Sequence, residues 1–174
     1  MKRICWLIVA ALLGACTPAP QFIDGTGNNL SLSALTGKPL LVNYFAPWCA
    51  PCLREMPLLA ALHREGQIGV IAINYDPASP GELAELARRH QIAVPLMVPL
   101  DEASLPFPRP GALPTSYLLD DKGQLQKTLV GELDEHKLAA LLVFDATPAT
   151  ETCPFSLHDA PGCTLPGAPR CMQA

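Results

Sequence analysis

The stretch that decides the fold is Phe45-Ala46-Pro47-Trp48-Cys49-Ala50-Pro51-Cys52-Leu53-Arg54-Glu55-Met56-Pro57. Its cysteines lie three positions apart, and the first turn of a helix holds such residues near the ~5.5–6 Å between Cα atoms that a disulfide requires. Pro51 favours this place, because the amide that proline lacks would have no intrahelical partner in a first turn. The stretch therefore predicts a helix that begins at two cysteines able to form a disulfide.

The predicted place of Cys49 at a helix N-terminus has a chemical consequence. Free amide groups and the helix dipole stabilise negative charge there, and the thiolate is the species that attacks a disulfide. The alternative for a Cys-x-x-Cys motif is half of a zinc site, which needs a second pair of ligands. The chain has no further Cys-x-x-Cys and no His-x-x-x-His. The motif therefore favours redox chemistry.

Length and composition set outer limits on the function. A chain of 174 residues has room for one domain with a full core and short appendages. Its formal net charge is −4, with 12 basic and 16 acidic side chains, which gives no electrostatic basis for binding nucleic acid. No segment reaches the roughly 18 consecutive apolar residues of a membrane-spanning helix. We therefore expect a single domain that does not bind nucleic acid.

The first residues have the layout of a secretory signal. Lys2 and Arg3 precede an apolar run over residues 4–13, and small residues follow. The sequence Leu13-Gly14-Ala15-Cys16 resembles the lipobox of bacterial lipoproteins, in which the cysteine is diacylated and becomes the new N-terminus. We expect a signal peptide over residues 1–15, a lipid on Cys16 and a tether over residues 16–21. The alternative is an ordinary signal cut near Ala15 that leaves Cys16 free.

These features place the expected protein on the periplasmic side of the bacterial cell envelope. More than one acyl chain gives stable anchoring where a single chain binds a membrane only marginally. Thr17 follows the cysteine where, by resemblance, an aspartate would retain the protein in the inner membrane. The sequence leaves open which of the two membranes holds the anchor.

Periodicity along the rest of the chain predicts an α/β sandwich built on a βαβ unit. We expect a hairpin within residues 22–36 and a helix that runs from the cysteines to Gly66, kinked at Pro57. Pro95 and Pro99 reduce the apolar run at 94–100 to a short or edge strand. The other expected strands cover residues 40–45, 69–74, 115–120 and 125–130, and the other expected helices cover residues 82–90 and 132–143.

Over residues 22–143 the chain resembles the thioredoxin superfamily, and within it the TlpA/ResA/DsbE group of membrane-tethered, extracytoplasmic thiol-disulfide oxidoreductases. The resemblance rests on the run 43–49 that leads to Cys49, on Cys52-Leu-Arg-Glu55-Met-Pro57, and on Gly111-Ala-Leu-Pro-Thr-Ser-Tyr117, which resembles the cis-proline loop. It implies a thioredoxin-like domain over residues 22–145, with a central mixed β-sheet flanked by helices.

The resemblance assigns roles to the residues that match its motifs. Cys49 would attack the substrate disulfide and Cys52 would resolve the mixed disulfide. Pro114 would form the cis peptide bond beside Cys49 and leave the Leu113 backbone free to pair with an extended substrate. The alternative for Pro114 is an ordinary trans proline in a loop. No cofactor is implied beyond the two thiols.

The residues around the cysteines bear on substrate binding and on direction. Trp48, Ala50 and Pro51 would form part of the docking surface, although Trp48 has the alternative of a simply packed aromatic. A proline before the second cysteine resembles the reducing members, whereas the oxidising DsbA-like enzymes have histidine there. We therefore expect a reductase of oxidised exported proteins, with apocytochrome c as the family precedent. In an oxidising compartment it would need electrons from a membrane-embedded donor of the CcdA/DsbD kind.

Glu55 resembles the active-site acid of the same group. It follows Cys52 by one turn, where a partly buried carboxylate can accept the proton that Cys52 loses. The alternative is an exposed glutamate that only complements the helix dipole. Asn43 stands where general thioredoxins carry a buried aspartate, so Glu55 is the remaining acid in the matched motifs.

The segment 146–174 is rich in proline and falls outside the resemblance. It has little apolar periodicity, and we expect it to be irregular. It contains Cys153, Cys163 and Cys171. Three readings stay open for these thiols: one structural disulfide with one cysteine left over, a disulfide that exchanges with Cys49 and Cys52, or a soft-metal site completed by His158.

Two other functions compete with disulfide reduction. Thioredoxin-fold lipoproteins that deliver copper carry Cys-x-x-x-Cys and a distal histidine, whereas this chain has Cys-x-x-Cys and no histidine near Pro114. A thiol peroxidase on the same scaffold would require Thr-x-x-Cys in place of Trp-Cys-Ala-Pro-Cys. The sequence favours the oxidoreductase over both.

Overall fold

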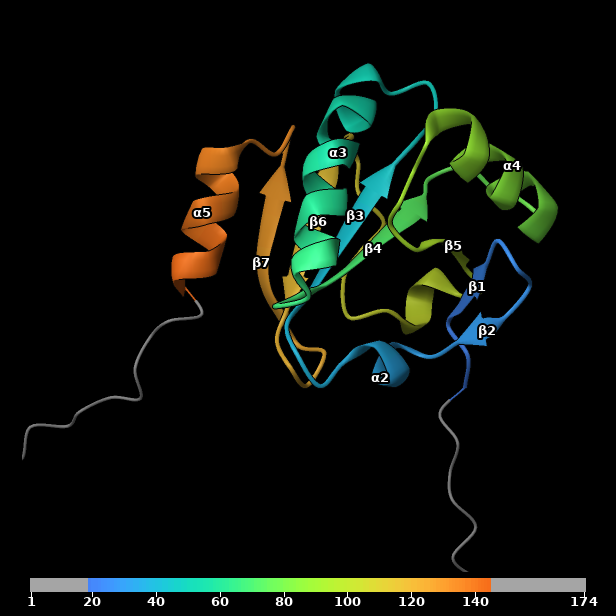
Figure 1. The fold of residues 1–174 in the computed structure, drawn as a ribbon. Helices are drawn as coiled ribbons and strands as arrows, with labels where there is room; N and C mark the ends of the chain where they lie inside the picture. The colour runs from blue at the N-terminus through green and yellow to red at the C-terminus, as the bar shows by residue number, and fades with distance from the viewer. Residues whose placement is uncertain (1–18, 145–174) are drawn as a thin grey trace, which may run out of the picture.

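The computed structural model describes residues 19–144 (Figure 1). The expected signal peptide, the expected lipidation site Cys16 and the segment with Cys153, Cys163 and Cys171 lie outside these residues. Within them, no helix has the length and apolar character that crossing a bilayer requires. The elements are β1 (Phe22–Asp24), β2 (Asn29–Leu30), α2 (Leu32–Leu35), β3 (Leu40–Phe45), α3 (Ala50–Glu65), β4 (Gly69–Asn74), α4 (Pro80–His90), β5 (Leu96–Pro99), η1 (Glu102–Ser104), β6 (Thr115–Leu119), β7 (Leu125–Val130) and α5 (Glu135–Phe144).

One mixed sheet of seven strands forms the centre of the domain, in the order β2-β1-β5-β4-β3-β6-β7. Strands β3, β4 and β5 are parallel, and β6, β7, β1 and β2 extend the sheet by antiparallel pairing. Helices α3 and α4 make the two crossovers that parallel neighbours require (Figure 1). The predicted fold class, a thioredoxin-like α/β sandwich, is confirmed.

Both faces of the central strand β3 are buried, as its continuous apolar sequence predicts. Leu41 and Phe45 point to the face that packs against α3 and α4. Val42 and Tyr44 point to the opposite face, where Phe107 from the proline-rich loop covers the sheet. Asn43 lies between Leu41 and Phe45 and shares their face of the strand, so its side chain also faces α3. This alternation places a polar side chain beneath the helix that carries the cysteines.

Local sequence explains where the two long helices begin and end. The Cys49 side chain caps α3 and Pro51 occupies its first turn, while Gly66 ends it with φ 73°, in the left-handed region that favours glycine. Ser79 and Glu82 form a reciprocal capping box at the start of α4. Helix α3 continues through Pro57 to Glu65 as one element.

The structure adds detail to three features predicted from the sequence. Strand β5 is short, as expected, and it is an interior strand between β1 and β4. Pro95 precedes it and Pro99 lies at its end, so the missing amides do not interrupt the middle of the ladder. The second strand of the entrance hairpin ends at Leu30, because the Leu32 amide donates to Gln21 Oε1 at 2.7 Å and α2 begins there.

The third feature is the closing helix. The sequence predicted that it begins at residue 132, which is wrong, because α5 begins at Glu135. Asp134 accepts a hydrogen bond from the Lys137 amide at 2.8 Å through its side chain. The same residue accepts one from the Leu138 amide through its carbonyl at 2.9 Å. An aspartate with these contacts caps the helix, so the residues before it are free for other partners.

Candidate active site

The two cysteines of the motif lie where β3 passes into α3, and they form a disulfide. Their Cα atoms are 5.3 Å apart, within the range that the spacing predicts. The Sγ atom of Cys49 accepts a hydrogen bond from the Cys52 amide at 3.3 Å. Cys49 is therefore the N-cap of α3, as expected, and its sulfur is the one held by the free amides of the first turn.

The two sulfur atoms differ in access. Cys49 is 6% exposed, whereas Cys52 has no exposed surface. An incoming disulfide can therefore reach Cys49 but not Cys52 without rearrangement. This difference agrees with the predicted division of roles between an attacking and a resolving cysteine.

An open groove of about 570 Å³ lies over the disulfide. Trp48 forms part of its wall and is 65% exposed, which excludes the reading of a simply packed aromatic. The indole N–H donates to Asp76 Oδ2 at 2.7 Å, which fixes the orientation of the ring. The lining residues are Trp48, Cys49, Ala50, Pro51, Tyr75, Gly111, Ala112 and Leu113. All four expected docking residues thus meet at one groove.

Tyr75 completes this groove and was not predicted from the sequence. Its ring packs edge-on to Trp48, with 6.4 Å between ring centroids. The guanidinium of Arg109 lies 4.1 Å from the Tyr75 ring centroid and also donates to the Tyr75 carbonyl at 2.8 Å. The signal was available: Tyr75 follows β4, and the carboxyl ends of neighbouring parallel strands share one edge of a sheet.

The loop opposite the cysteines contains the expected cis peptide bond, between Leu113 and Pro114. Pro114 is buried, and Leu113 is half-buried and lines the groove. Thr115 Oγ1 donates to the Ala112 carbonyl at 2.9 Å, which closes the loop. Among residues 19–144, no hydrogen bond uses the backbone of Leu113. The loop therefore presents unpaired backbone groups beside the sulfur atoms.

Glu55 is buried behind the disulfide, with only 2% of its surface exposed. One carboxylate oxygen accepts a hydrogen bond from Asn43 Nδ2 at 2.7 Å, and the other accepts one from the Leu133 amide at 2.7 Å. Asn43 Nδ2 also donates to Ser116 Oγ at 2.9 Å. The alternative of an exposed glutamate that complements the helix dipole is therefore wrong.

The environment of Glu55 acts on its proton affinity in two directions. Burial raises the pKa of Glu55, because desolvation penalises the charged form. The hydrogen bonds from Leu133 and Asn43 lower the pKa in part, since both donors favour the carboxylate. The net direction is upward, because desolvation outweighs the hydrogen bonds.

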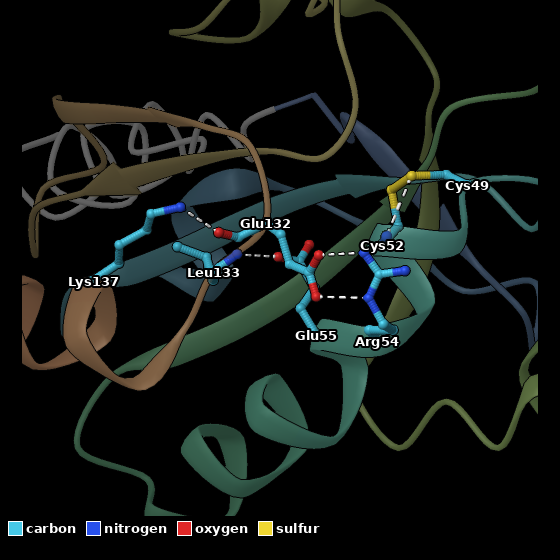
Figure 2. Close-up of polar contacts among 7 residues, drawn as sticks. All are labelled: Cys49, Cys52, Arg54, Glu55, Glu132, Leu133 and Lys137. Carbon is cyan, nitrogen blue, oxygen red and sulfur yellow. Dashed lines mark hydrogen bonds and ion pairs between the residues drawn. A yellow bond between two sulfur atoms is a disulfide. The ribbon is translucent and has the colours of Figure 1, made fainter.

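An ion pair lies beside this buried network, at the surface of the molecule. The Arg54 guanidinium donates two hydrogen bonds to the two carboxylate oxygens of Glu132. The Lys137 ammonium donates to the Glu132 carbonyl at 2.6 Å. Figure 2 shows Arg54 and Glu55 from α3 facing Glu132 and Leu133, with the two cysteines nearer the start of the helix. Sequence reasoning missed Glu132 and Leu133, because they lie far from the motif in the chain.

The described residues offer no competing metal centre. Between residues 19 and 144, no three side chains of histidine, cysteine, aspartate or glutamate are grouped so as to hold a metal ion.

A disulfide at the start of a helix, opposite a cis-proline loop in a mixed sheet, defines a thiol-disulfide oxidoreductase with a thioredoxin-like fold. The chain belongs to the redoxin family, whose model matches residues 14–142.

Relatives with related names support this class. The thioredoxin-like protein YneN of Bacillus subtilis is 30% identical over 133 residues, which cover 73% of this chain and 78% of YneN. The thiol-disulfide oxidoreductase ResA of Bacillus cereus is 27% identical over 129 residues, which cover 71% of this chain and 74% of ResA.

Solved structures agree with the same assignment. A putative thioredoxin from Neisseria meningitidis is 29% identical, with a TM-score of 0.59 over 73% of this chain and 87% of that one. A putative thiol:disulfide interchange protein DsbE from Chlorobium tepidum is 26% identical, with a TM-score of 0.54 over 74% and 92% of the two chains.

Proposed function

We propose that this protein reduces disulfides in exported proteins outside the cytoplasm, through the dithiol of Cys49 and Cys52. The observation that carries the proposal is the unequal access of the two sulfur atoms: Cys49 borders the groove, and Cys52 is wholly buried beneath it. Such a pair suits a reaction in which one sulfur meets the substrate and the other meets only its partner.

The proposed reaction has two exchange steps. In the first, the Cys49 thiolate attacks the substrate disulfide, a bond forms between the two sulfur atoms, and the other substrate sulfur leaves as a thiolate. In the second, Cys52 loses its proton and attacks Cys49, which forms the intramolecular disulfide and releases the second substrate thiolate. Two electrons pass from the dithiol to the substrate, and the product state of the protein is the disulfide described above.

Glu55 is the group that we assign to accept the proton of Cys52. Cys52 has no exposed surface, so water cannot easily take this proton. Glu55 follows it by one turn of α3, is buried itself and has a pKa raised by burial. A carboxylate with these properties gains a proton readily when a neighbouring thiol loses one.

The groove supplies the proposed binding site for an extended segment of the substrate. Trp48, Ala50 and Pro51 line one side, and the Leu113 backbone lies opposite, beside the buried Pro114. Backbone hydrogen bonds to Leu113 would hold a substrate strand without reading its sequence, as in other strand-addition complexes. The site would thus accept many unfolded segments that contain an oxidised cysteine.

The reductive direction and the cellular setting are supported by the sequence. Pro51 before the second cysteine favours reduction, and the signal-like residues 1–15 with Cys16 favour a lipid-anchored protein outside the cytoplasm. We propose a membrane-embedded electron donor of the CcdA/DsbD kind and oxidised exported proteins as substrates, with apocytochrome c as one member of that class.

The reduction potential of the Cys49–Cys52 pair tests this direction. Equilibration of the purified chain with glutathione or dithiothreitol buffers gives the potential from the fraction of oxidised protein. We expect a value near or below about −250 mV, on the thioredoxin side of the range. A value near about −120 mV, which is typical of DsbA, would show that the protein oxidises its substrates and would overturn the proposed direction.

A further inference from the structure

Three consecutive residues between β7 and α5 contact three different parts of the active site. The Gly131 amide donates to the Pro114 carbonyl at 2.9 Å, in the cis-proline loop. The Glu132 carboxylate binds the Arg54 guanidinium on α3. The Leu133 amide donates to Glu55 Oε2 at 2.7 Å. We call residues 131–133 the bridging segment.

We propose that the bridging segment is a positioning element, in which the Arg54–Glu132 ion pair holds the Leu133 amide against the Glu55 carboxylate. The proposal rests on the proposed function in one respect, the role of Glu55 as the proton acceptor of Cys52. The residues of the bridging segment do not line the substrate groove.

The geometry of the ion pair supports a positioning role. Exposed ion pairs contribute little to stability on average, but a bidentate contact between arginine and a carboxylate fixes both distance and orientation. Arg54 and Glu55 are neighbours on α3, and Glu132 and Leu133 are neighbours in the bridging segment. The exposed ion pair and the buried hydrogen bond therefore join the same two pieces of backbone side by side, as Figure 2 shows.

The backbone of the bridging segment is held as well. Gly131 has φ 92°, in the left-handed region that favours glycine, and its amide continues the hydrogen bonding between β6 and β7. At the middle residue, Lys137 Nζ donates to the Glu132 carbonyl at 2.6 Å. With the backbone of Gly131 and Glu132 held in this way, the Arg54–Glu132 contact acts directly beside the Leu133 amide that bonds Glu55.

The surroundings of Glu55 determine in which direction its pKa changes when the ion pair is removed. The groups around the Glu55 carboxyl group are Asn43 from β3, with Ser116 behind it on β6, and the charged side chains Glu132 and Lys137 from the bridging segment and α5. The negative charge of Glu132 raises the pKa of Glu55, so removing only that charge would lower it. Loss of the Leu133 hydrogen bond would raise it. The two effects have opposite directions.

The test compares Arg54→Ala, Glu132→Gln and the double variant with the unmodified chain. The readout is the pH titration of the Glu55 side-chain carboxyl carbon by NMR in the oxidised full-length protein, where Cys49 and Cys52 do not titrate. We expect Arg54→Ala to raise the proton affinity of Glu55 by about tenfold, the effect of one lost hydrogen bond to a charged group. Glu132→Gln and the double variant should raise it by less, because they also remove the Glu132 charge. Arg54→Lys, which keeps the charge without the bidentate fork, should fall between.

A matched control is available on α4. Arg88 donates two hydrogen bonds to the Glu85 carboxylate in a second exposed, bidentate ion pair. Arg88→Ala should leave the titration of Glu55 unchanged, because this pair has no contact with the bridging segment.

The outcomes separate the proposal from its rivals. A lower proton affinity of Glu55 in Glu132→Gln would mean that only the charge matters and would overturn the positioning role. An unchanged titration in all variants would overturn it too. Because the oxidised protein performs no exchange, these results do not depend on whether Glu55 accepts a proton during turnover. That role is tested separately by the pH–rate profile of Glu55→Gln.

Discussion

The first turns of α3 separate two regions with opposite character. On one side lies the groove, with the exposed Trp48, the ring of Tyr75 and the half-buried Leu113. On the other side Glu55 and Asn43 are buried and fully enclosed by protein groups. The disulfide lies between the two regions.

The difference indicates a division of labour between them. In the proposed mechanism, the groove brings the substrate sulfur to Cys49, which requires apolar surface and unpaired backbone groups. The buried region would exchange a proton with Cys52, which requires a carboxyl group shielded from water. The groove should therefore govern substrate binding, and the buried region should govern the pH dependence of the second step.

The largest expected effect comes from the sulfur atoms, where the two regions meet. Cys49→Ser should abolish disulfide exchange, because the reachable nucleophile is lost. Cys52→Ser should retain the first step and accumulate mixed disulfides with substrate, since no resolving thiol remains. Non-reducing gel electrophoresis after incubation with an oxidised protein measures both. Equal behaviour of the two variants would contradict the assigned roles.

A large effect is also expected in the buried region. Glu55→Gln should slow the resolution of the mixed disulfide by about 100-fold at neutral pH, the lower end of what general acid–base catalysis contributes. The amide can stay in place if the Asn43 side-chain amide rotates by half a turn, because Asn43 Oδ1 has no hydrogen-bond partner among the described residues and would then accept from it.

Stopped-flow kinetics across pH would measure this step in Glu55→Gln. The apparent pKa that limits the step should rise towards that of an unassisted thiol. A pH profile identical to that of the unmodified protein would remove Glu55 from the mechanism and leave the groove and the sulfur atoms as its only parts.

A smaller effect is expected in the groove. Tyr75→Ala should raise KM for protein substrates by about tenfold, as the loss of a buried aromatic contact produces, and should leave kcat nearly unchanged. Steady-state reduction of an oxidised protein measures both constants. Arg109→Gln, which removes the cation over the Tyr75 ring but keeps the ring, serves as a milder comparison. A fall in kcat alone would place Tyr75 in the chemistry.

The smallest expected effect is on the Tm. It concerns the buried region alone and is measured without substrate. The raised pKa of Glu55 means that the folded protein binds this proton more tightly than the unfolded chain does. Its contribution is therefore complete below the ordinary value of 4.5 and is lost as pH rises through the folded-state pKa. As the pH falls towards 4.5, the Tm of the unmodified protein should rise relative to that of Glu55→Gln, by about 2–4 °C for each kcal/mol. The opposite trend in calorimetry would contradict the raised pKa.

The spacing of the site residues along the chain explains which of them could be predicted from the sequence. Cys49, Cys52 and Glu55 lie within two helical turns, so one periodic pattern placed all three. Leu113 and Pro114 belong to a second short motif. Leu133 lies 78 residues from Glu55, and its contribution is a backbone amide that no side-chain pattern reveals.

The fold shows the same limit. Largely apolar runs predicted β3 and β4 to the residue, because a strand buried on both faces needs mostly apolar side chains. The short length of β5 was predicted, but its interior position was not, since that position depends on pairing with β1 from the start of the domain. Asp134 is a helix cap visible in the sequence, but the bridging segment before it has no local signature.

The short connection from Leu133 to α5 also gives the molecule a mechanical property. Asp134 alone separates the two, so tension applied to α5 would travel along the chain to the Leu133 amide before it reached β7. The Leu133–Glu55 hydrogen bond is thus the first contact before α5 through which a movement of that helix would reach the buried carboxyl group.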